Sequence, residues 1–262
     1  MEVLASRYEA FLFDLDGVVY RGPAAVPGAP EAIRRLREMG KRIAFVTNNS
    51  ARTPEAVAEV LTKVGVPADP AEVETSALAT ASLLASRGVR EVFVVGEEGI
   101  RRALLDEGIA ITGADATATD AVVVGWDRGV DYAKLRTASV LVERGAALVA
   151  TNADASFPAA DGDWPGAGAL LAAIETTTGV RAEVVGKPNA PVLLAAWERV
   201  ARGHPLLIGD RLDTDIAGAS GVGWDSLLVL TGISKREEIE LASVTPTYVG
   251  DDLSVLFRPA PD

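Results

Sequence analysis

Short runs of apolar, mostly β-branched residues alternate with amphipathic helical patterns along almost the whole chain. Apolar runs of this kind are typical of buried parallel strands. They occur at residues 10–14, 42–48, 91–96, 120–126, 147–152, 182–187, 205–210 and 226–230. Helical patterns stand between them, for example at 30–40 and 53–65. This alternation predicts an α/β fold whose parallel sheets are covered by helices on both faces.

Local signals mark the ends of one helix and the position of one long loop. Thr53 is suited to cap the helix at 53–65, Pro54 to begin it and Gly65 to end it. Residues 157–168 (FPAADGDWPGAG) are the longest stretch rich in glycine and proline. We interpret this stretch as an ordered functional loop rather than a linker.

Ligands of open α/β sheets bind beyond the carboxyl ends of the strands, so the residues after each run are the first candidates for chemistry. Asp14 ends the run at 10–14, Asp16 follows it, and Gly17 allows the backbone to turn sharply. Asp14 can act as a carboxylate nucleophile. Asp16 can protonate a leaving oxygen and later deprotonate a water. The alternative is that both aspartates only form turns and caps, as most strand-end aspartates do.

The second candidate segment is FVTNNS, in which Thr47, Asn48 and Asn49 follow an apolar run. Their side chains and the neighbouring backbone N–H groups can hold phosphate oxygens. Simple capping of the following helix explains the same residues equally well.

The third segment is VGKPN, in which Lys187 ends the run at 182–187. Lys187 and Asn189 are candidates for binding phosphate or substrate. A lysine at this edge of the sheet can neutralise a phosphate and Asp14 together. A single lysine is more often a solvated surface group. The segment is not a P-loop, because position 181 is an arginine where that motif requires glycine.

The fourth segment, IGDRLDTD, places Asp210, Asp213 and Asp215 within six residues after a run. Such carboxylates suit a hard cation, and Mg²⁺ is favoured because it binds through few carboxylates together with substrate oxygens and waters. Capping of a helix by Asp213 or Thr214 is the alternative, and both roles can hold at once. The four segments together supply what phosphoryl transfer requires, namely positioning and charge stabilisation.

Composition narrows the class of protein and of partner. The formal net charge of −12 disfavours duplex nucleic acid and anionic membranes as partners. There is no cysteine, which excludes disulfides and thiolate chemistry and fits a cytoplasmic protein. The single histidine, His204, excludes a histidine-based metal site, and it precedes a strand at the end away from the candidate site. We see neither a signal peptide nor an apolar run long enough to span a membrane.

In this order the four segments resemble the motifs of the haloacid dehalogenase (HAD) superfamily of phosphatases. Within it, FDLDGVVYRG, FVTNNSARTPE, VVGKPN and IGDRLDTDIAGA are similar to the NagD / 4-nitrophenylphosphatase group. VVVGWDR and VATNADASFP resemble parts of that group's cap, so the similarity spans nearly the whole chain. One departure is Val18-Val19, where many relatives have threonine or another polar residue.

The resemblance implies a role for each matching residue. Asp14 is then the nucleophile and a Mg²⁺ ligand, and Asp16 is the general acid and base that also binds the metal through its backbone carbonyl. Thr47 and Asn48 hold the phosphate, and Lys187 pairs with Asp14 and the phosphate. Asp210 is a further Mg²⁺ ligand, whereas Asp215 acts on the metal site without touching the ion.

The resemblance also implies the domain organisation: a Rossmann-like core of residues 1–77 and 183–262, with a smaller α/β cap inserted at 78–182. Such a cap closes over the substrate, excludes water and supplies specificity contacts. Residues 151–158 are then the place to look for contacts with the leaving group. Relatives of this kind often dimerise through the cap.

We therefore expect a Mg²⁺-dependent phosphatase that acts on a small phosphorylated metabolite, with glycerol 3-phosphate or phosphoglycolate as the first candidates. A sugar or nucleotide monophosphatase of the same family is an alternative. A phospho-accepting signalling or binding protein is another, but a receiver module has neither an inserted domain nor an acid in the position of Asp16. The roles of Arg52, Arg211 and Trp164 stay open.

Overall fold

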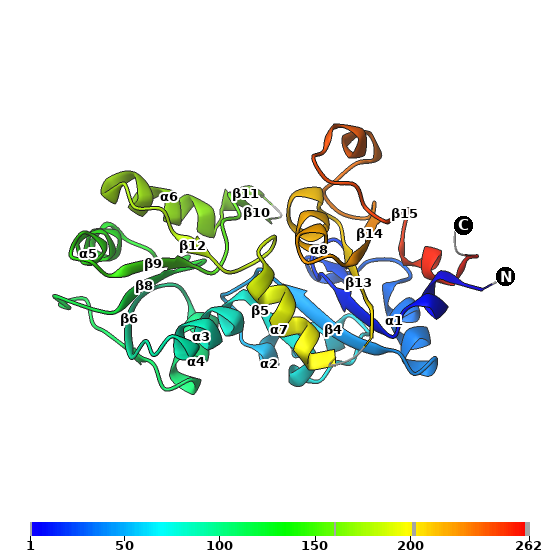
Figure 1. Cartoon of the computed structure of the whole chain (residues 1–262), viewed down its shortest axis with the longest axis horizontal. Helices are drawn as coiled ribbons and strands as arrows, with labels where there is room; N and C mark the ends of the chain where they lie inside the picture. Colours follow the sequence, from blue (N-terminus) through cyan, green and yellow to red (C-terminus); the bar gives the residue numbers. More distant parts are fainter. Residues whose placement is uncertain (1, 160, 201–202, 260–262) are drawn as a thin grey trace. The chain divides into compact units, whose positions relative to one another are not determined.

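Strand β1 (Ala10–Phe13) lies inside a six-stranded sheet in the order β15-β14-β13-β1-β4-β5 (Figure 1). Its two neighbours, β13 (Pro205–Gly209) and β4 (Arg42–Thr47), both run parallel to it. β14 (Asp225–Val229) and β15 (Tyr248–Gly250) continue the parallel pairing, and β5 (Val73–Thr75) forms the other edge. The structure is a computed structural model that describes residues 2–159, 161–200 and 203–259.

The chain divides into two compact units. The core unit comprises residues 1–47, 55–74 and 187–262, and the inserted unit comprises 48–54 and 75–186. The sequence analysis expected the insertion at residues 78–182. In the structure the inserted unit extends over 75–186 and also includes 48–54. In Figure 1 the core unit combines blue ribbons from the start of the chain with yellow-to-red ribbons from its end.

Helices and short turns complete the core unit. The α-helices are α1 (Ala29–Glu38), α2 (Pro54–Lys63), α7 (Ala190–Val200) and α8 (Ala217–Gly221), and β2 (Tyr20–Arg21) pairs with β3 (Ala24–Ala25) in a small hairpin. The 3₁₀ turns are η1 (Leu4–Arg7), η2 (Pro70–Glu72), η4 (Arg236–Leu241) and η5 (Leu253–Phe257), and η3 (Leu212–Ile216) is a π-helical turn.

Alternation along the central strands places apolar side chains on both faces of the core sheet. Phe11, Phe13 and Phe45 are fully buried on one face, in a cluster that includes Ile33 and Leu36 of α1. Leu12 and Ala44 alternate with these residues and are also fully buried, and α7 contacts both β1 and β4. Burial on both faces explains why these strands read as continuous apolar runs in the sequence.

The inserted unit has its own five-stranded parallel sheet, in the order β12-β9-β8-β6-β7. The strands are β6 (Glu91–Val95), β7 (Ala110–Ile111), β8 (Ala121–Val124), β9 (Ala147–Ala150) and β12 (Glu183–Val184). The helices are α3 (Ser76–Ser86), α4 (Glu98–Asp106), α5 (Tyr132–Glu143) and α6 (Ala167–Thr178). A separate buried cluster joins this sheet to α5 and α6, so the unit has a hydrophobic core of its own.

The expected α/β class is confirmed, and all eight apolar runs contain a strand. The expectation of a loop at 157–168 is wrong in part, because β10 (Ser156–Ala159) and β11 (Gly162–Pro165) pair there as an antiparallel hairpin. Phe157 of this hairpin stacks on Trp126, with ring centroids 4.4 Å apart. An exposed hairpin with few β-branched residues carries little periodic signal, which is why the sequence pattern favours a loop.

His204 lies just before β13, where its Nε2 is 3.2 Å from Asp225 Oδ2. It therefore lies at the amino end of a strand whose carboxyl end leads to Asp210, as the sequence indicated. Among the described residues, no helix combines the length and the apolar character needed to cross a membrane.

Truncation of Phe45 should test the central packing of the core. Its ring is fully buried and lies 6.2 Å from that of Phe13, measured between centroids. We expect Phe45→Ala to lower the free energy of unfolding by about 3–5 kcal/mol, because a large cavity remains. The control Leu241→Ala, at a side chain that is 87% exposed, should change it by less than about 0.5 kcal/mol. Guanidinium chloride unfolding followed by circular dichroism measures both, and equal effects would contradict this packing.

Candidate active site

The carboxyl ends of three adjacent parallel strands carry most of the predicted site residues. Asp14 follows β1, Thr47 ends β4 and Asp210 follows β13. The backbone N–H of Asp14 donates to the carbonyl oxygen of Ile208 at 2.8 Å, which extends the pairing of β1 with β13 by one residue. From β1 the chain adds β4 and β5 on one side and later β13, β14 and β15 on the other. The strand order therefore reverses at β1, and such switch points are where α/β sheets bind ligands.

Lys187, which precedes α7, is the cation at the centre of this sheet edge. Its side chain is only 3% exposed. The Nζ atom forms ion pairs with Asp14 Oδ1 and with Asp215 Oδ1, the latter at 2.6 Å, and lies 3.3 Å from the carbonyl oxygen of Val46. Lys187 is therefore buried, and the alternative that it is a solvated surface group is wrong.

Asp210 is held by the backbone that surrounds it. Its Oδ2 accepts a hydrogen bond of 2.7 Å from the N–H of Ile233. Gly17 and Gly232 both approach its carboxylate so closely that a Cβ on either would overlap with it. Gly17 also has a φ of +85°, which a side chain would disfavour.

Asp14, Asp210 and Asp215 offer carboxylate oxygens that all lie within 4.8 Å of one another. Burial raises the pKa of Asp14 well above its usual range, and the charges of Asp215 and Asp210 raise it further, although Lys187 opposes them. Burial together with the charge of Asp215 raises the pKa of Asp210 to about 7, although the hydrogen bond from the N–H of Ile233 lowers it. For Lys187 the two carboxylates outweigh burial, and its pKa is raised.

The donor set of this cluster fits a divalent cation. Among the described residues, three buried carboxylates share one buried lysine, so this cluster carries an excess of negative charge, and uncompensated buried charge is unfavourable. Carboxylate oxygens are the ligands preferred by hard cations such as Mg²⁺ and Ca²⁺. A divalent ion would also favour the ionised form of each carboxylate and so reverse the raised pKa values.

The other predicted site residues of the core unit are Asp16, Thr47 and Asn189. Asp16 is half-buried in the turn after β1, where the N–H of Gly17 donates to the carbonyl of Tyr20 at 2.8 Å. Thr47 is buried, with 3% of its surface exposed. Asn189 is exposed in the turn before α7.

Asn48 and Asn49 group with the inserted unit rather than with the core. There the amide Nδ2 of Asn48 donates to Asp154 Oδ2 at 3.1 Å, and Asn152 Nδ2 donates to the carbonyl of Asn48 at 2.8 Å. Asn49 Oδ1 accepts from the N–H of Ala51 at 3.0 Å, a contact of the kind that shapes a turn. Their assignment to phosphate stays a prediction.

The structure shows the positions of the three residues to which the sequence analysis assigned no role. Arg211 pairs with Asp213 at 2.7 Å, and Arg52 is exposed in the inserted unit. Trp164 lies on β11 opposite Phe157, is 40% exposed, and donates from Nε1 to Asp161 at 2.8 Å.

Sequence reasoning missed the segment 231–234 (TGIS), which contacts Asp210 after β14. The N–H of Ser234 donates to the carbonyl oxygen of Asp210 at 3.0 Å, in addition to the contact of Ile233. A signal was present, because polar residues and a glycine directly follow the apolar run at 226–230. The same rule that selected the other strand ends would have selected this one.

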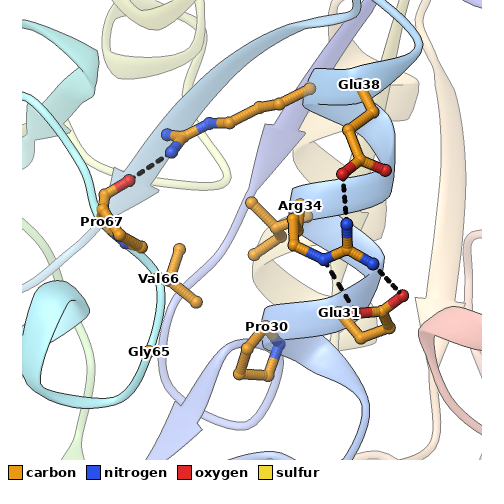
Figure 2. A pocket seen from close by; sticks show the side chains of 9 residues that line it. Pro30, Glu31, Arg34, Glu38, Gly65, Val66 and Pro67 are labelled. Carbon is orange, nitrogen blue, oxygen red and sulfur yellow. Dashed lines mark hydrogen bonds and ion pairs between the residues drawn. The ribbon is translucent and has the colours of Figure 1, made fainter.

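A pocket of about 620 Å³ lies elsewhere in the core unit, between α1 and residues 65–67 (Figure 2). Pro30 and Val66 form part of its apolar wall. Arg34 extends along it but is paired with Glu31 at 2.6 Å and with Glu38. The second arginine of the pocket, Arg37, is paired with Glu72 at 2.7 Å. None of the predicted site residues lines this pocket and both of its arginines are paired, so it is not the candidate active site.

Family models match both parts of the core. One for haloacid dehalogenase-like hydrolases matches residues 11–110, and one for HAD-hydrolase-like proteins matches residues 184–256. Together they include Asp14, Lys187 and Asp210.

Similar proteins of known name match over nearly the full chain. An acid sugar phosphatase of Staphylococcus saprophyticus is 39% identical over 255 residues, which are 96% of this chain and 98% of that protein. The structure of glycerol phosphate phosphatase Rv1692 from Mycobacterium tuberculosis, in complex with magnesium, has a TM-score of 0.94 at 35% identity, covering 100% of this chain and 82% of that one. A p-nitrophenyl phosphatase from Archaeoglobus fulgidus has a TM-score of 0.89 at 32% identity, covering 95% and 98%. The chain therefore belongs to the haloacid dehalogenase superfamily, as a phosphatase of the NagD / 4-nitrophenylphosphatase-like group.

Proposed function

We propose that this phosphatase uses Mg²⁺ and hydrolyses small organic phosphomonoesters through an aspartyl-phosphate at Asp14. The observation that carries the proposal is the buried cluster in which Lys187 pairs with Asp14 and Asp215, while Asp210 offers a carboxylate oxygen within 4.8 Å of an oxygen of each of these acids. Burial of three carboxylates beside one lysine is unfavourable unless a further cation binds. Catalysis of phosphoryl transfer relies on charged groups positioned in this way.

The proposed reaction has two displacements. A carboxylate oxygen of Asp14 attacks phosphorus, the bond to the ester oxygen breaks, and Asp16 gives its proton to the departing alcohol. Asp16 then takes a proton from water, whose oxygen attacks the phosphorus of the aspartyl-phosphate. The bond between phosphorus and the Asp14 oxygen breaks, inorganic phosphate leaves, and the carboxylate of Asp14 is restored.

The charged residues near Asp14 make these steps possible. Lys187 balances the negative charge of Asp14 and of the phosphoryl group, and Asp215 keeps the lysine oriented through its 2.6 Å ion pair. Thr47, which ends the neighbouring strand β4, would hold a phosphate oxygen with its hydroxyl. Asp14, Asp210 and the backbone carbonyl of Asp16 would hold Mg²⁺, which stabilises the charge that develops on the phosphoryl oxygens.

The substrate proposed first is glycerol 3-phosphate. Support comes from the similarity to the mycobacterial glycerol phosphate phosphatase, which extends over the whole of this chain. Phosphoglycolate and sugar or nucleotide monophosphates are the next esters to test, and the staphylococcal relative is named for sugar phosphates.

We assign the choice among these esters to the inserted unit acting as a cap, with residues 151–158 as the specificity segment. Asp154 belongs to this segment and accepts the hydrogen bond of Asn48. A carboxylate there would suit an ester that carries hydroxyl groups, such as a polyol or a sugar. Dimerisation through the cap stays a prediction.

The role of Asp14 is tested by Asp14→Asn. We expect turnover of 4-nitrophenyl phosphate to fall by at least about 10³-fold, because an amide cannot form the covalent intermediate. Circular dichroism should show an unchanged fold. Asp213→Asn, a matched change at an exposed carboxylate of the same sheet edge, should leave turnover near that of the unchanged enzyme. Retained activity in Asp14→Asn would remove Asp14 as the nucleophile.

Metal dependence is tested by EDTA treatment and by Asp210→Ala. We expect EDTA to abolish phosphate release and added Mg²⁺ to restore it. Loss of the Asp210 ligand should raise the Mg²⁺ concentration for half-maximal activity by about 10–100-fold or more. A titration of activity with Mg²⁺ measures this, and an unchanged requirement would refute the ligand role.

The specificity segment is tested by Asp154→Ala and Phe157→Ala. We expect the ratio of kcat/KM for glycerol 3-phosphate to that for 4-nitrophenyl phosphate to fall by about tenfold, because a contact with the alcohol part is lost. Asp115→Ala, at an exposed position between β7 and β8, serves as the control from the same unit. Equal loss for both esters would place specificity elsewhere.

A further inference from the structure

Residues 231–234, which follow β14, connect three loops at the carboxyl edge of the core sheet. Thr231 Oγ1 donates a hydrogen bond of 2.6 Å to the carbonyl oxygen of Gly17, in the loop after β1. The N–H of Ile233 donates to Asp210 Oδ2 at 2.7 Å, and the N–H of Ser234 donates to the carbonyl oxygen of Asp210 at 3.0 Å. Ser234 Oγ accepts from the N–H of Leu212 at 3.0 Å, so the segment also holds the loop that follows Asp210.

The glycine of this segment leaves no space beside Asp210. A Cβ at Gly232 would overlap with the Cβ, Cγ and Oδ2 atoms of Asp210. A Cβ at Gly17 would overlap with the same carboxylate and lie 3.0 Å from the Cα of Gly232. The side chain of Asp210 is therefore confined between two backbone segments and is only 2% exposed.

We propose that residues 231–233 are positioning residues for the metal site: Thr231 holds the turn at Gly17, and Gly232 and Ile233 set the orientation of the Asp210 carboxylate. None of them is expected to touch the metal or the substrate. The inference rests on the proposed Mg²⁺ site of Asp14 and Asp210 and adds the residues that orient it.

Physical reasons make this orientation matter. A hydrogen bond to Oδ2 fixes the rotation of the Asp210 carboxylate and hence the place of its other oxygen. Mg²⁺ requires near-ideal octahedral geometry, so a ligand that can rotate binds it less well. The Thr231 hydroxyl restrains the turn that carries Asp16 and begins directly after Asp14, so one segment orients both sides of the site.

The test is direct binding of Mg²⁺ to the full chain without substrate, measured by titration calorimetry, beside the melting temperature of the metal-free protein. Thr231→Val removes the hydroxyl and keeps the shape, whereas Thr231→Ser keeps the hydroxyl. Gly232→Ala adds the methyl group that overlaps with Asp210. Gly221→Ala is the matched control, because a Cβ there meets nothing within 4 Å.

We expect Thr231→Val and Gly232→Ala to weaken Mg²⁺ binding by about 10–100-fold, the usual effect of losing a residue that orients a ligand. Thr231→Ser and Gly221→Ala should bind within about twofold of the unchanged protein, since each keeps the ligand orientation. In kinetics the loss should appear as a higher Mg²⁺ requirement, while KM for the ester at saturating Mg²⁺ stays the same.

Three results would overturn the inference: unchanged affinity in Thr231→Val and Gly232→Ala, a lower melting temperature without weaker binding, or equal losses in Thr231→Ser and Thr231→Val. If Gly232→Ala does not fold, the Thr231 pair decides alone. Failure of the unchanged protein to bind Mg²⁺ is a different outcome, because it overturns the proposed metal site itself.

Discussion

The arrangement of the core depends on the burial of three carboxylates around one lysine. Asp14, Asp210 and Asp215 arrive from two strand ends, and Lys187 arrives from a distant part of the chain. The buried charge of Lys187 is stable there only because Asp14 and Asp215 pair with it, and each of these two acids in turn depends on the lysine. The sheet order, the glycines beside Asp210 and the segment after β14 can all be understood as ways of holding this set together.

Much of the fold and the chemical centre could be predicted from the sequence, for a physical reason. Strands that are buried on both faces read as apolar runs, and a change to polar residues marks where such a run ends. This signal located Asp14, Thr47 and Asp210 and their shared edge of the core sheet. It also selected Lys187, although the strand before it, β12, belongs to the sheet of the inserted unit. The sequence indicated that Lys187 neutralises Asp14 but not that it also pairs with Asp215, because a residue's partners depend on how the chain is arranged in space.

The parts of the structure that were not predicted lack such a local sequence pattern. The β10–β11 hairpin is short, exposed and rich in glycine and proline, so neither periodicity nor propensity marks it. The division of the chain into units was available only through resemblance, since α/β patterns look alike in the core and in the inserted unit. The grouping of Asn48 with Asp154 depends on a contact 106 residues apart in the chain, which no local pattern reports.

The discontinuous core has a consequence for how the chain is completed during synthesis. β13 lies between β1 and β14, yet it is made only after the whole inserted unit, so the core sheet has an open edge along β1 until then. The inserted unit is almost one continuous stretch and needs no later segment for its own sheet. Domains fold as units as they emerge, and distant strand pairs form slowly. The insertion is thus able to reach its final structure first, and the charged centre is assembled late, when the last third of the chain arrives.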